Sequence, residues 1–361
     1  MTDELLLRYG VIGTGMMGVE HILNVLALDD TSVTAIADPD AGSRDAGLAA
    51  AGVGTSVYTN HHDLLADDSI DAVVVATPNF THLDVMRDVL ATGKHVICEK
   101  PLATTTADCK TMIELADGYP GVVWVGLEYR YMPAVQALIN EAHAGVAGDV
   151  KMVTIREHRF PFLEKIGDWN RFSKNTGGTL VEKTCHYFDL MNLIIGQRPV
   201  QVYASGGQSV NHLDEIYDGE RSDILDNAYV TVDYPDGVRA MLDLCMFAEA
   251  TKDQEEISVV GDVGKLDARV PTSELHVGIR SGEGWPDIGQ VETRSITNED
   301  IRHTGLHHGA SYLEHVDFAY AIRNNTPPLV TLEDGLWSVA MGEAANRSIA
   351  ENRPVALTEL I

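Results

Sequence analysis

The sequence is poor in basic residues, in cysteine and in long apolar runs. Its 361 residues include 26 lysines and arginines against 54 aspartates and glutamates, a formal net charge of −28. Such a charge repels nucleic acid and anionic lipid surfaces, so we exclude both as partners. No apolar run approaches the roughly 20 residues that a membrane-spanning helix needs. The 45% of hydrophobic residues nevertheless suffices for a large buried core.

Cysteine is scarce and widely spaced. The four cysteines, at positions 98, 109, 185 and 245, form no CxxC pair and no zinc-ligand spacing. We therefore expect free thiols and a reducing, cytoplasmic location. The chain starts with the acidic segment Met1-Thr2-Asp3-Glu4, in which we expect no secretory or transit signal.

The first third of the chain alternates short apolar runs with helical patterns. Runs that predict strands cover residues 8–13, 32–37, 72–76, 95–98 and 122–125. Helical patterns between them cover residues 18–28, 43–51, 81–92 and 107–117. Strands alternating with helices predict βαβ crossovers and a doubly wound parallel sheet, the α/β architecture of a Rossmann domain.

The remainder has a different periodicity. Polar and apolar residues alternate with a period of two in 149–158, 200–206, 227–234, 239–246 and 256–260. This pattern predicts a large open, mostly antiparallel sheet with one wet face. Helical patterns at 180–195, 312–324 and 332–351 accompany it. We therefore predict two domains, residues 1–127 and an α+β domain of residues 128–361.

A glycine-rich turn follows the first predicted strand. The segment Gly13-Thr14-Gly15-Met16-Met17-Gly18 matches GxGxxG and opens a predicted helix. In this context the glycines allow a tight turn, close approach of a pyrophosphate and close helix–strand packing. The helix N-terminus offers N–H groups to the phosphates. The sequence has no GxxxxGK[ST] segment, which excludes a P-loop, and no GxSxG segment, which excludes a nucleophile elbow.

The choice of dinucleotide rests mainly on Asp38. It lies 20 residues after Gly18, at the end of the second predicted strand. A carboxylate there accepts hydrogen bonds from ribose hydroxyls and repels a 2′-phosphate. Pro39 follows, and Arg44 is the nearby cation that could still reach such a phosphate. The pattern favours NAD over NADP.

Three further segments resemble the glucose–fructose oxidoreductase / inositol dehydrogenase / MocA family. Thr77-Pro78-Asn79-Phe80-Thr81-His82 is similar to its TPxxxH segment, and Glu99-Lys100-Pro101 to its EKP signature. Residues 177–190, GGTLVEKTCHYFDL, resemble its GG-x-L-x-D-x-x-x-H-x-x-D-L helix. The resemblance runs nearly end to end. It implies an NAD-binding Rossmann domain followed by a domain for substrate binding and oligomerisation.

The sequence departs from the family pattern at two places. Glu182 stands where the family commonly has aspartate, and Glu128-Tyr129-Arg130 stands where it often has N-x-R. Lys183, beside Glu182, is also unusual. These departures predict a subfamily with a substrate pocket of its own.

Three residues are candidates for catalysis. Hydride transfer from a secondary alcohol needs a base and a group that stabilises the developing alkoxide. His186 suits the first role and Lys100 the second, as the resemblance implies. Glu182 precedes His186 by four residues, so a continuous helix would put both on one face. The alternatives are a core histidine, a solvated lysine and a salt bridge from Glu182.

The cofactor and the substrate have further candidate contacts. For the cofactor they are Gly13, Thr14, Gly15, Met16, Met17, Gly18, Asp38, Thr77, Pro78, Asn79, His82, Glu99, Lys100 and Arg130. For the substrate they are Lys100, His158, Trp169, Asn170, Glu182, Lys183 and His186. The alternatives are Asn79 as a helix cap, Arg130 in an interdomain salt bridge, Trp169 in packing and Lys183 at the surface.

No metal is predicted. The adjacent His307 and His308 lack a carboxylate that would complete a site, and Lys100 can supply the positive charge that the chemistry needs. The pattern assigns no role to this histidine pair or to Asp189.

These observations predict an NAD-dependent oxidoreductase acting on a ring secondary alcohol of a sugar, cyclitol or glycoside. A keto-sugar reductase of the anhydro-ketose type and a non-catalytic sensor of NAD or sugar stay open as alternatives. We expect a homodimer or homotetramer, because an apolar sheet face needs a partner to cover it.

Overall fold

The structure is a computed structural model that describes residues 6–361. The acidic start of the chain, in which we expected no targeting signal, lies outside the described residues. Two compact units form, one from residues up to Tyr131 with Glu299–Val339, the other from Met132–Asn298 with Ala340–Ile361. The contacts thus group Glu299–Val339 with the N-terminal part, whereas the boundary predicted at 127/128 assigns these residues to the second domain. None of the described helices is long and apolar enough to cross a membrane.

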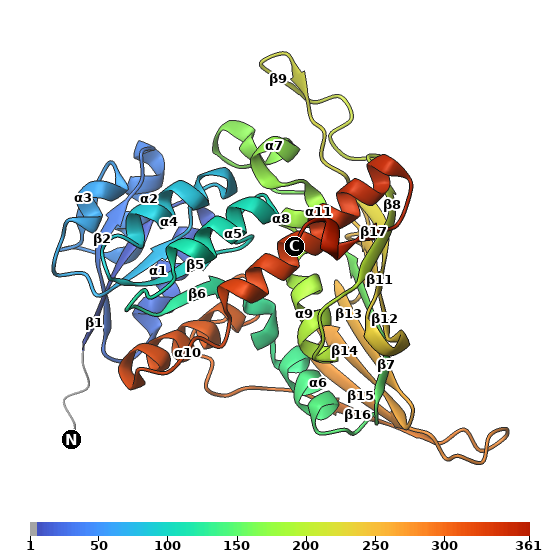
Figure 1. Ribbon diagram of the computed structural model, residues 1–361. Helices are drawn as coiled ribbons and strands as arrows, with labels where there is room; N and C mark the ends of the chain where they lie inside the picture. Colours follow the sequence, from blue (N-terminus) through green and yellow to red (C-terminus); the bar gives the residue numbers. More distant parts are fainter. Residues whose placement is uncertain (1–5) are drawn as a thin grey trace. The chain divides into compact units, whose positions relative to one another are not determined.

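The first unit is built on a six-stranded parallel sheet with the order β3-β2-β1-β4-β5-β6 (Figure 1). This is the predicted Rossmann topology. The order reverses between β1 and β4, and ligands of such folds bind there, at the carboxyl ends of the strands. The strands are β1 (Leu7–Ile12), β2 (Thr31–Ala37), β3 (Ser56–Tyr58), β4 (Ala72–Val75), β5 (His95–Glu99) and β6 (Val123–Gly126).

Helices connect these strands and contribute to the core. They are α1 (Met16–Ala27), α2 (Ala41–Ala51), α3 (His61–Leu65), α4 (His82–Val89), α5 (Thr106–Leu115) and α10 (Ala310–Asn324), with two 3-10 turns, η1 (Asn79–Thr81) and η2 (Glu128–Tyr131). Helix α11 (Leu332–Glu351) begins in this unit and ends in the other. The valine run of β4 is fully buried, as expected for a strand covered on both faces.

The second unit contains a nine-stranded sheet with the order β16-β15-β14-β13-β7-β12-β11-β8-β17. Its neighbouring strands are antiparallel except β7 and β12, so the predicted mostly antiparallel sheet is confirmed. The strands are β7 (Val150–His158), β8 (Gln201–Gly207), β11 (Asn227–Asp233), β12 (Arg239–Cys245), β13 (Glu255–Gly261), β14 (Gly264–Val270), β15 (Glu274–Ile279), β16 (Gln290–Ser295) and β17 (Val355–Ala356).

Helices cover one face of this sheet. Helix α9 packs against β7, and α6 packs against β14 and β15. The helices are α6 (Pro133–His143), α7 (Ser173–Thr176), α8 (Thr179–Glu182), α9 (Cys185–Ile195) and the later part of α11, with 3-10 segments η3 (Ile166–Arg171), η4 (Pro235–Gly237) and η5 (Leu357–Glu359). A small hairpin of β9 (Ile216–Tyr217) and β10 (Glu220–Arg221) projects from the unit (Figure 1).

The helix predicted over residues 180–195 is interrupted, so that prediction is wrong in one respect. Helix α8 ends at Glu182, and α9 begins at Cys185. The Thr184 hydroxyl donates to the Leu180 carbonyl, 2.7 Å away, and the backbone bonds of Tyr187 and Phe188 restart from the Thr184 carbonyl. A threonine hydroxyl that bonds back to the preceding turn competes with the helical ladder. Glu182 and His186 therefore stand on two successive short helices.

Candidate functional site

The glycine turn lies where the strand order of the parallel sheet reverses. Gly13 has a φ of 86°, and a Cβ on it would lie 2.6 Å from the Ala76 carbonyl oxygen. A Cβ on Gly18 would lie 1.9 Å from the Gly13 oxygen, so both positions exclude a side chain. Gly15 is different, because no atom lies within 4 Å of the corresponding point. The second glycine thus faces open space, as a site for a pyrophosphate requires.

The turn and Asp38 are tied together by hydrogen bonds. The Asp38 carboxylate accepts from the Thr14 N–H at 2.8 Å and from the Asp40 N–H at 2.8 Å. Gly15 caps α1 without a side-chain hydrogen bond, and no acidic residue lies in the first turn of α1. The N–H groups of this helix start are therefore available to an anion. Arg44 donates to the carbonyls of Asp38 and Pro39, at 2.7 and 2.9 Å.

These features fit a dinucleotide. An open second glycine, an uncapped helix start and a carboxylate fixed beside the turn are the parts that bind the pyrophosphate and the adenosine ribose of NAD. The guanidinium of Arg44 already binds two backbone carbonyls, and the Asp38 charge repels a 2′-phosphate. The residues present therefore fit NAD better than NADP.

The loop after β4 is cross-linked to the loop after β5. His82 is fully buried, with Nδ1 2.9 Å from the Pro101 oxygen and Nε2 3.0 Å from the Thr77 oxygen. Burial lowers the pKa of His82, against the opposing effect of the two carbonyls. Asn79 lies in the same loop and is 6% exposed, and its Nδ2 has no partner among residues 6–361. His82 thus holds the two loops together, while Asn79 keeps a donor for a ligand.

The EKP segment forms the carboxyl end of β5. The Lys100 N–H donates to Glu99 Oε2 at 2.9 Å, and Glu99 Oε1 lies 2.9 Å from His21 Nε2. Burial opposes the charge of Glu99, but the hydrogen bond from His21 and the nearby Lys100 ammonium outweigh it and lower the pKa of Glu99. Glu99 is therefore a buried anion beside Lys100.

Residues around the 3-10 turn η2 are bound within the same unit. Arg130 Nη1 donates to the Leu329 carbonyl at 2.9 Å, and its Nη2 lies 3.3 Å from Asp334 Oδ2. Glu128 lies beside His307, with 3.3 Å between Oε1 and Nδ1. Arg130 thus forms a salt bridge, but with a carboxylate of its own unit and not between domains as the alternative had it. Its contact with the cofactor stays a prediction.

In the second unit, the candidates Glu182, Lys183 and His186 lie on and between the two short helices α8 and α9. They are 8%, 5% and 1% exposed, so none of them is a solvated surface group. Lys183 Nζ lies 2.9 Å from Glu157 Oε1 in β7. The lysine that departs from the family pattern is therefore committed to a carboxylate of the sheet.

Sequence reasoning missed the acidic partners of Lys183. Glu157 is fully buried and also binds Arg159, with 3.2 Å between Nη1 and Oε1. Glu255 pairs with Glu157 across β13 and β7 and is 2% exposed. Burial, and then the charge of Glu157, raise the pKa of Glu255 to about 7. The parity of β7 was the available signal, because Glu157 shares a face with Val153 and Ile155.

His158 lies on the other face of β7. Its Nε2 is 3.3 Å from Asp243 Oδ1 of the neighbouring strand β12, and both side chains are partly exposed. Side chains alternate along a strand, so His158 points away from the face that α9 covers. The contact of His158 with the substrate stays a prediction.

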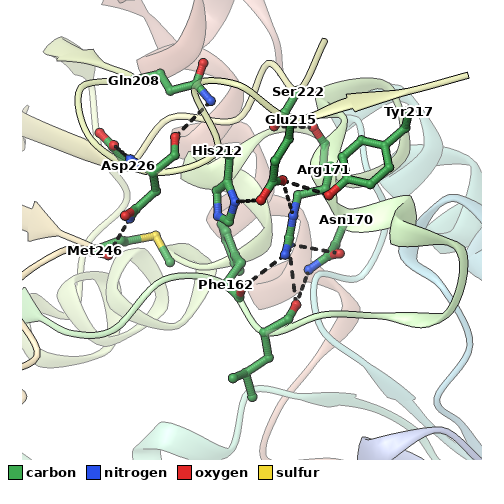
Figure 2. Close-up of polar contacts among 12 residues, drawn as sticks. Phe162, Asn170, Arg171, Gln208, His212, Glu215, Tyr217, Ser222, Asp226 and Met246 are labelled. Carbon is green, nitrogen blue, oxygen red and sulfur yellow. Dashed lines mark hydrogen bonds and ion pairs between the residues drawn. The ribbon is translucent and has the colours of Figure 1, made fainter. Parts of the chain in front are cut away.

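The candidates in η3 anchor a loop. Figure 2 shows Asn170 and Arg171 with their partners: Asn170 Nδ2 donates to the Leu163 carbonyl at 3.0 Å, and its Oδ1 accepts from Arg171. Arg171 Nε donates to Glu215 Oε2 at 3.0 Å. The Trp169 carbonyl accepts from the amide of Asn175. Asn170 is fully buried, so its polar groups serve the segment that leads into α8.

One group of possible metal ligands occurs among residues 6–361. His61, His62 and Asp88 bring a ligand atom each within 4.8 Å of one another on α3 and α4. Asp88 Oδ2 is 2.8 Å from His61 Nε2, the geometry of an ordinary ion pair, and His62 is exposed. The absence of a metal from the catalytic site stays a prediction.

Known proteins resemble the chain over nearly its whole length. The chain is 29% identical to myo-inositol 2-dehydrogenase of Thermotoga maritima over 98% of this chain and 100% of that protein. It is 27% identical to inositol 2-dehydrogenase of Rhizobium meliloti over 97% and 99% of the two chains. A levoglucosan dehydrogenase in complex with NADH and levoglucosan has the same fold, with a TM-score of 0.83 and 20% identity over 97% and 99% of the two chains.

Two family models cover most of the sequence. The oxidoreductase family with an NAD-binding Rossmann fold matches residues 7–127, and the C-terminal alpha/beta domain of the same family matches residues 142–357. The chain thus carries an NAD-binding Rossmann domain, and the cofactor prediction is confirmed. The protein belongs to the glucose–fructose oxidoreductase / inositol dehydrogenase / MocA family of oxidoreductases.

Proposed function

We propose that the protein is an NAD-dependent dehydrogenase that oxidises one ring secondary alcohol of a cyclitol, sugar or glycoside. The observation that carries the proposal is the position of Lys100. It follows β5 at the ligand-binding end of the parallel sheet, with its backbone N–H bound to Glu99. The names of the two inositol dehydrogenases support the substrate class.

The reaction requires that a hydride and a proton leave the alcohol. NAD held at the glycine turn and Asp38 would supply the acceptor for the hydride and its electron pair. His186 takes the hydroxyl proton, so the C–H and O–H bonds break and a ketone forms. The Lys100 ammonium stabilises the negative charge that develops on the oxygen. Glu182 binds a neighbouring hydroxyl of the ring.

In this proposal, the second unit contributes buried polar side chains that bind the substrate. Glu182 and His186 are nearly fully buried, which fixes their rotamers before a ligand arrives. Lys183 is held by Glu157, so it acts on the site from a fixed position. Polar groups of this density favour a polyol over an apolar alcohol.

The rate of NADH formation, followed by its near-ultraviolet absorbance, tests the proposal. We would assay myo-inositol, scyllo-inositol, glucose, xylose, galactose and simple glucosides, each with NAD and with NADP. Lys100→Ala is the test variant, and Lys252→Ala, at an exposed lysine, is the matched control. We expect turnover of at least one polyol with NAD, a loss of about a thousandfold or more in Lys100→Ala, and no change in the control.

The other outcomes distinguish the alternatives. Oxidation of NADH by a keto-sugar, without polyol oxidation, would assign the reductase direction. Tight NADH binding by fluorescence without turnover in either direction would indicate a sensor of NAD or sugar. Turnover that survives in Lys100→Ala would contradict the proposed mechanism.

A further inference from the structure

A chain of three buried titratable side chains runs through the first unit. His21 comes from α1, Glu99 from the end of β5 and His315 from α10, and none is more than 6% exposed. His21 Nε2 lies 2.9 Å from Glu99 Oε1, and His21 Nδ1 lies 2.8 Å from His315 Nε2. Three elements far apart in the sequence therefore meet at His21, three residues after the last glycine of the dinucleotide turn.

The protons on the side chains of His21, Glu99 and His315 can be assigned from their geometry. The carboxylate of Glu99 only accepts, so His21 Nε2 carries a hydrogen. One hydrogen lies between His21 Nδ1 and His315 Nε2, because one of these two nitrogens must donate and the other must accept. Burial, and then the proximity of His21, lower the pKa of His315 far below its usual range. His315 is thus neutral, and it gives His21 a permanent partner.

The chain ends in the core on one side and at Lys100 on the other. The ring of His315 packs edge-on against Tyr9, which is fully buried, with 6.2 Å between ring centroids. At the opposite end, Glu99 Oε2 accepts from the Lys100 N–H at 2.9 Å. The three hydrogen-bonded side chains thus connect the core of the unit to Lys100. Such an arrangement can keep the Glu99 carboxylate ionised beside Lys100.

The electrostatic coupling between Glu99 and Lys100 is reciprocal. The Lys100 ammonium lowers the pKa of Glu99, so the Glu99 carboxylate must equally favour the ammonium form of Lys100. An opposite charge at close range shifts a pKa by roughly 1–3 units. If Glu99 lost its donor from His21, burial would favour the neutral carboxylic acid, and Lys100 would lose this support.

Other charged and titratable groups face the pair from the surrounding elements. Burial, then Glu128 and Glu99, raise the pKa of Glu314 well above its usual range, and its Oε1 accepts from the Trp124 N–H at 3.1 Å. Further groups that interact with Glu99 or Glu314 are His82, Cys98, Glu128, Arg130, Tyr131 and His307. His21 bears most directly on Glu99, because its Nε2 is 2.9 Å from Glu99 Oε1 and its hydrogen bond is the largest effect that lowers the pKa of Glu99.

We propose that His21 and His315 are positioning residues, which keep Glu99 ionised and thereby hold Lys100 as an ammonium at the reacting oxygen. The inference rests on the proposed function for the role of Lys100. The state of Glu99 itself does not depend on turnover, so it can be measured separately.

Infrared difference spectroscopy measures the charge of Glu99 directly. A protonated buried carboxyl group has a C=O band that a carboxylate lacks. We expect a new band of this kind in His21→Leu relative to wild type, and its loss in His21→Leu/Glu99→Gln. His21→Gln keeps an N–H donor and should lack the band. A His21→Leu spectrum identical to that of wild type would overturn the inference.

The pH profile of kcat/KM tests the consequence for catalysis. The alkaline limb follows loss of the Lys100 proton, and the acid limb follows His186. In His21→Leu we expect the alkaline limb about one pH unit lower with the acid limb unchanged. His315→Leu should move the same limb in the same direction by a smaller amount, and His21→Gln should restore it.

The controls separate this role from damage to the fold. His62→Leu removes an exposed imidazole of the same unit and should leave both limbs in place. A uniform loss of activity in His21→Leu and His315→Leu, with both limbs unmoved, would show a merely structural role and overturn the proposal. If wild type oxidises no polyol, the proposed function fails, and the infrared bands alone decide whether the histidines hold Glu99 ionised.

Discussion

Asp38 is held in place by the polypeptide itself. Its carboxylate accepts the N–H groups of Thr14 and Asp40, each at 2.8 Å, so both oxygens are fixed beside the glycine turn. The charge that repels a 2′-phosphate therefore needs no rearrangement on binding. We therefore expect the choice between NAD and NADP to depend mainly on Asp38, since Arg44 is bound to backbone carbonyls.

Asp38→Asn should weaken the preference for NAD. The amide can still accept from Thr14, so the turn persists, but the repulsion of a 2′-phosphate is gone. We expect the ratio of kcat/KM for NADP to that for NAD to rise about tenfold, equivalent to about 1.4 kcal/mol. Steady-state kinetics with both cofactors measures it. Asp45→Asn, at an exposed residue of α2, is the control. An unchanged ratio would show that Asp38 does not discriminate.

Glu255 makes stability depend on pH. Burial, and then Glu157, raise its pKa from 4.5 to about 7 in the folded protein. Between these values the folded chain retains a proton that the unfolded chain has lost. The stabilisation from this group is therefore complete below pH 4.5 and is lost as the pH rises to about 7.

Glu255→Gln copies the protonated form at every pH. Relative to wild type, its free energy of unfolding should rise between about pH 4.5 and about pH 7 by about 3 kcal/mol. Urea unfolding of both proteins across this range measures the difference. Glu249→Gln, at an exposed position, should show no such trend. A constant difference between Glu255→Gln and wild type would place the pKa of Glu255 outside this range.

At the scale of helices and strands, the features that can be predicted from the sequence are those that a short local pattern encodes. The buried valine run of β4 and the turn at Gly13 were readable because burial and backbone conformation are encoded locally. The partners of His21 and Lys183 were not. His315 lies 294 residues from His21, and the contact between Lys183 and Glu157 depends on which face of β7 turns inward.

The break between α8 and α9 is a second feature that no local pattern predicted. The turn around Leu180 abuts α11 so closely that a Cβ on Gly342 would lie 2.1 Å from the Leu180 carbonyl oxygen. That oxygen accepts from the Thr184 hydroxyl. Packing against a distant glycine thus accompanies the interruption that separates Glu182 from His186.

Gly342→Ala should destabilise the protein, although alanine is the better helix former. Helix propensity alone would favour alanine by about 1 kcal/mol. The clash is with backbone, so we expect overpacking to dominate and the free energy of unfolding to fall by about 1–2 kcal/mol. Gly42→Ala in α2 meets only the side-chain oxygen of Asp40, at 3.2 Å, and should be neutral or stabilising. Urea unfolding compares the two; a stabilised Gly342→Ala would show that the α8 turn can move away.

At the scale of the whole molecule, a net charge of −28 keeps copies of the chain apart. The outer face of the large sheet opposes this repulsion. Met152, Tyr203 and Tyr229 on β7, β8 and β11 are 52%, 41% and 63% exposed on that face. On the same face they lie beside ion pairs such as Arg156–Glu256 and His158–Asp243, and a mixture of aromatic, apolar and charged side chains is typical of a surface that another copy covers.

Tyr229→Glu should therefore reduce the oligomeric state. The added charge would lie on this face in register with Asp243, where desolvation is costly and the partner copy carries the same charge. By light scattering, we expect wild type to have the mass of two or more copies of the 39.2 kDa chain, and we expect salt to favour the larger assembly. Tyr229→Glu should shift the mass toward that of the monomer. Tyr320→Glu, at an equally exposed tyrosine of α10, should not shift. A wild-type monomer, or equal masses for wild type and Tyr229→Glu, would rule out this face as the interface.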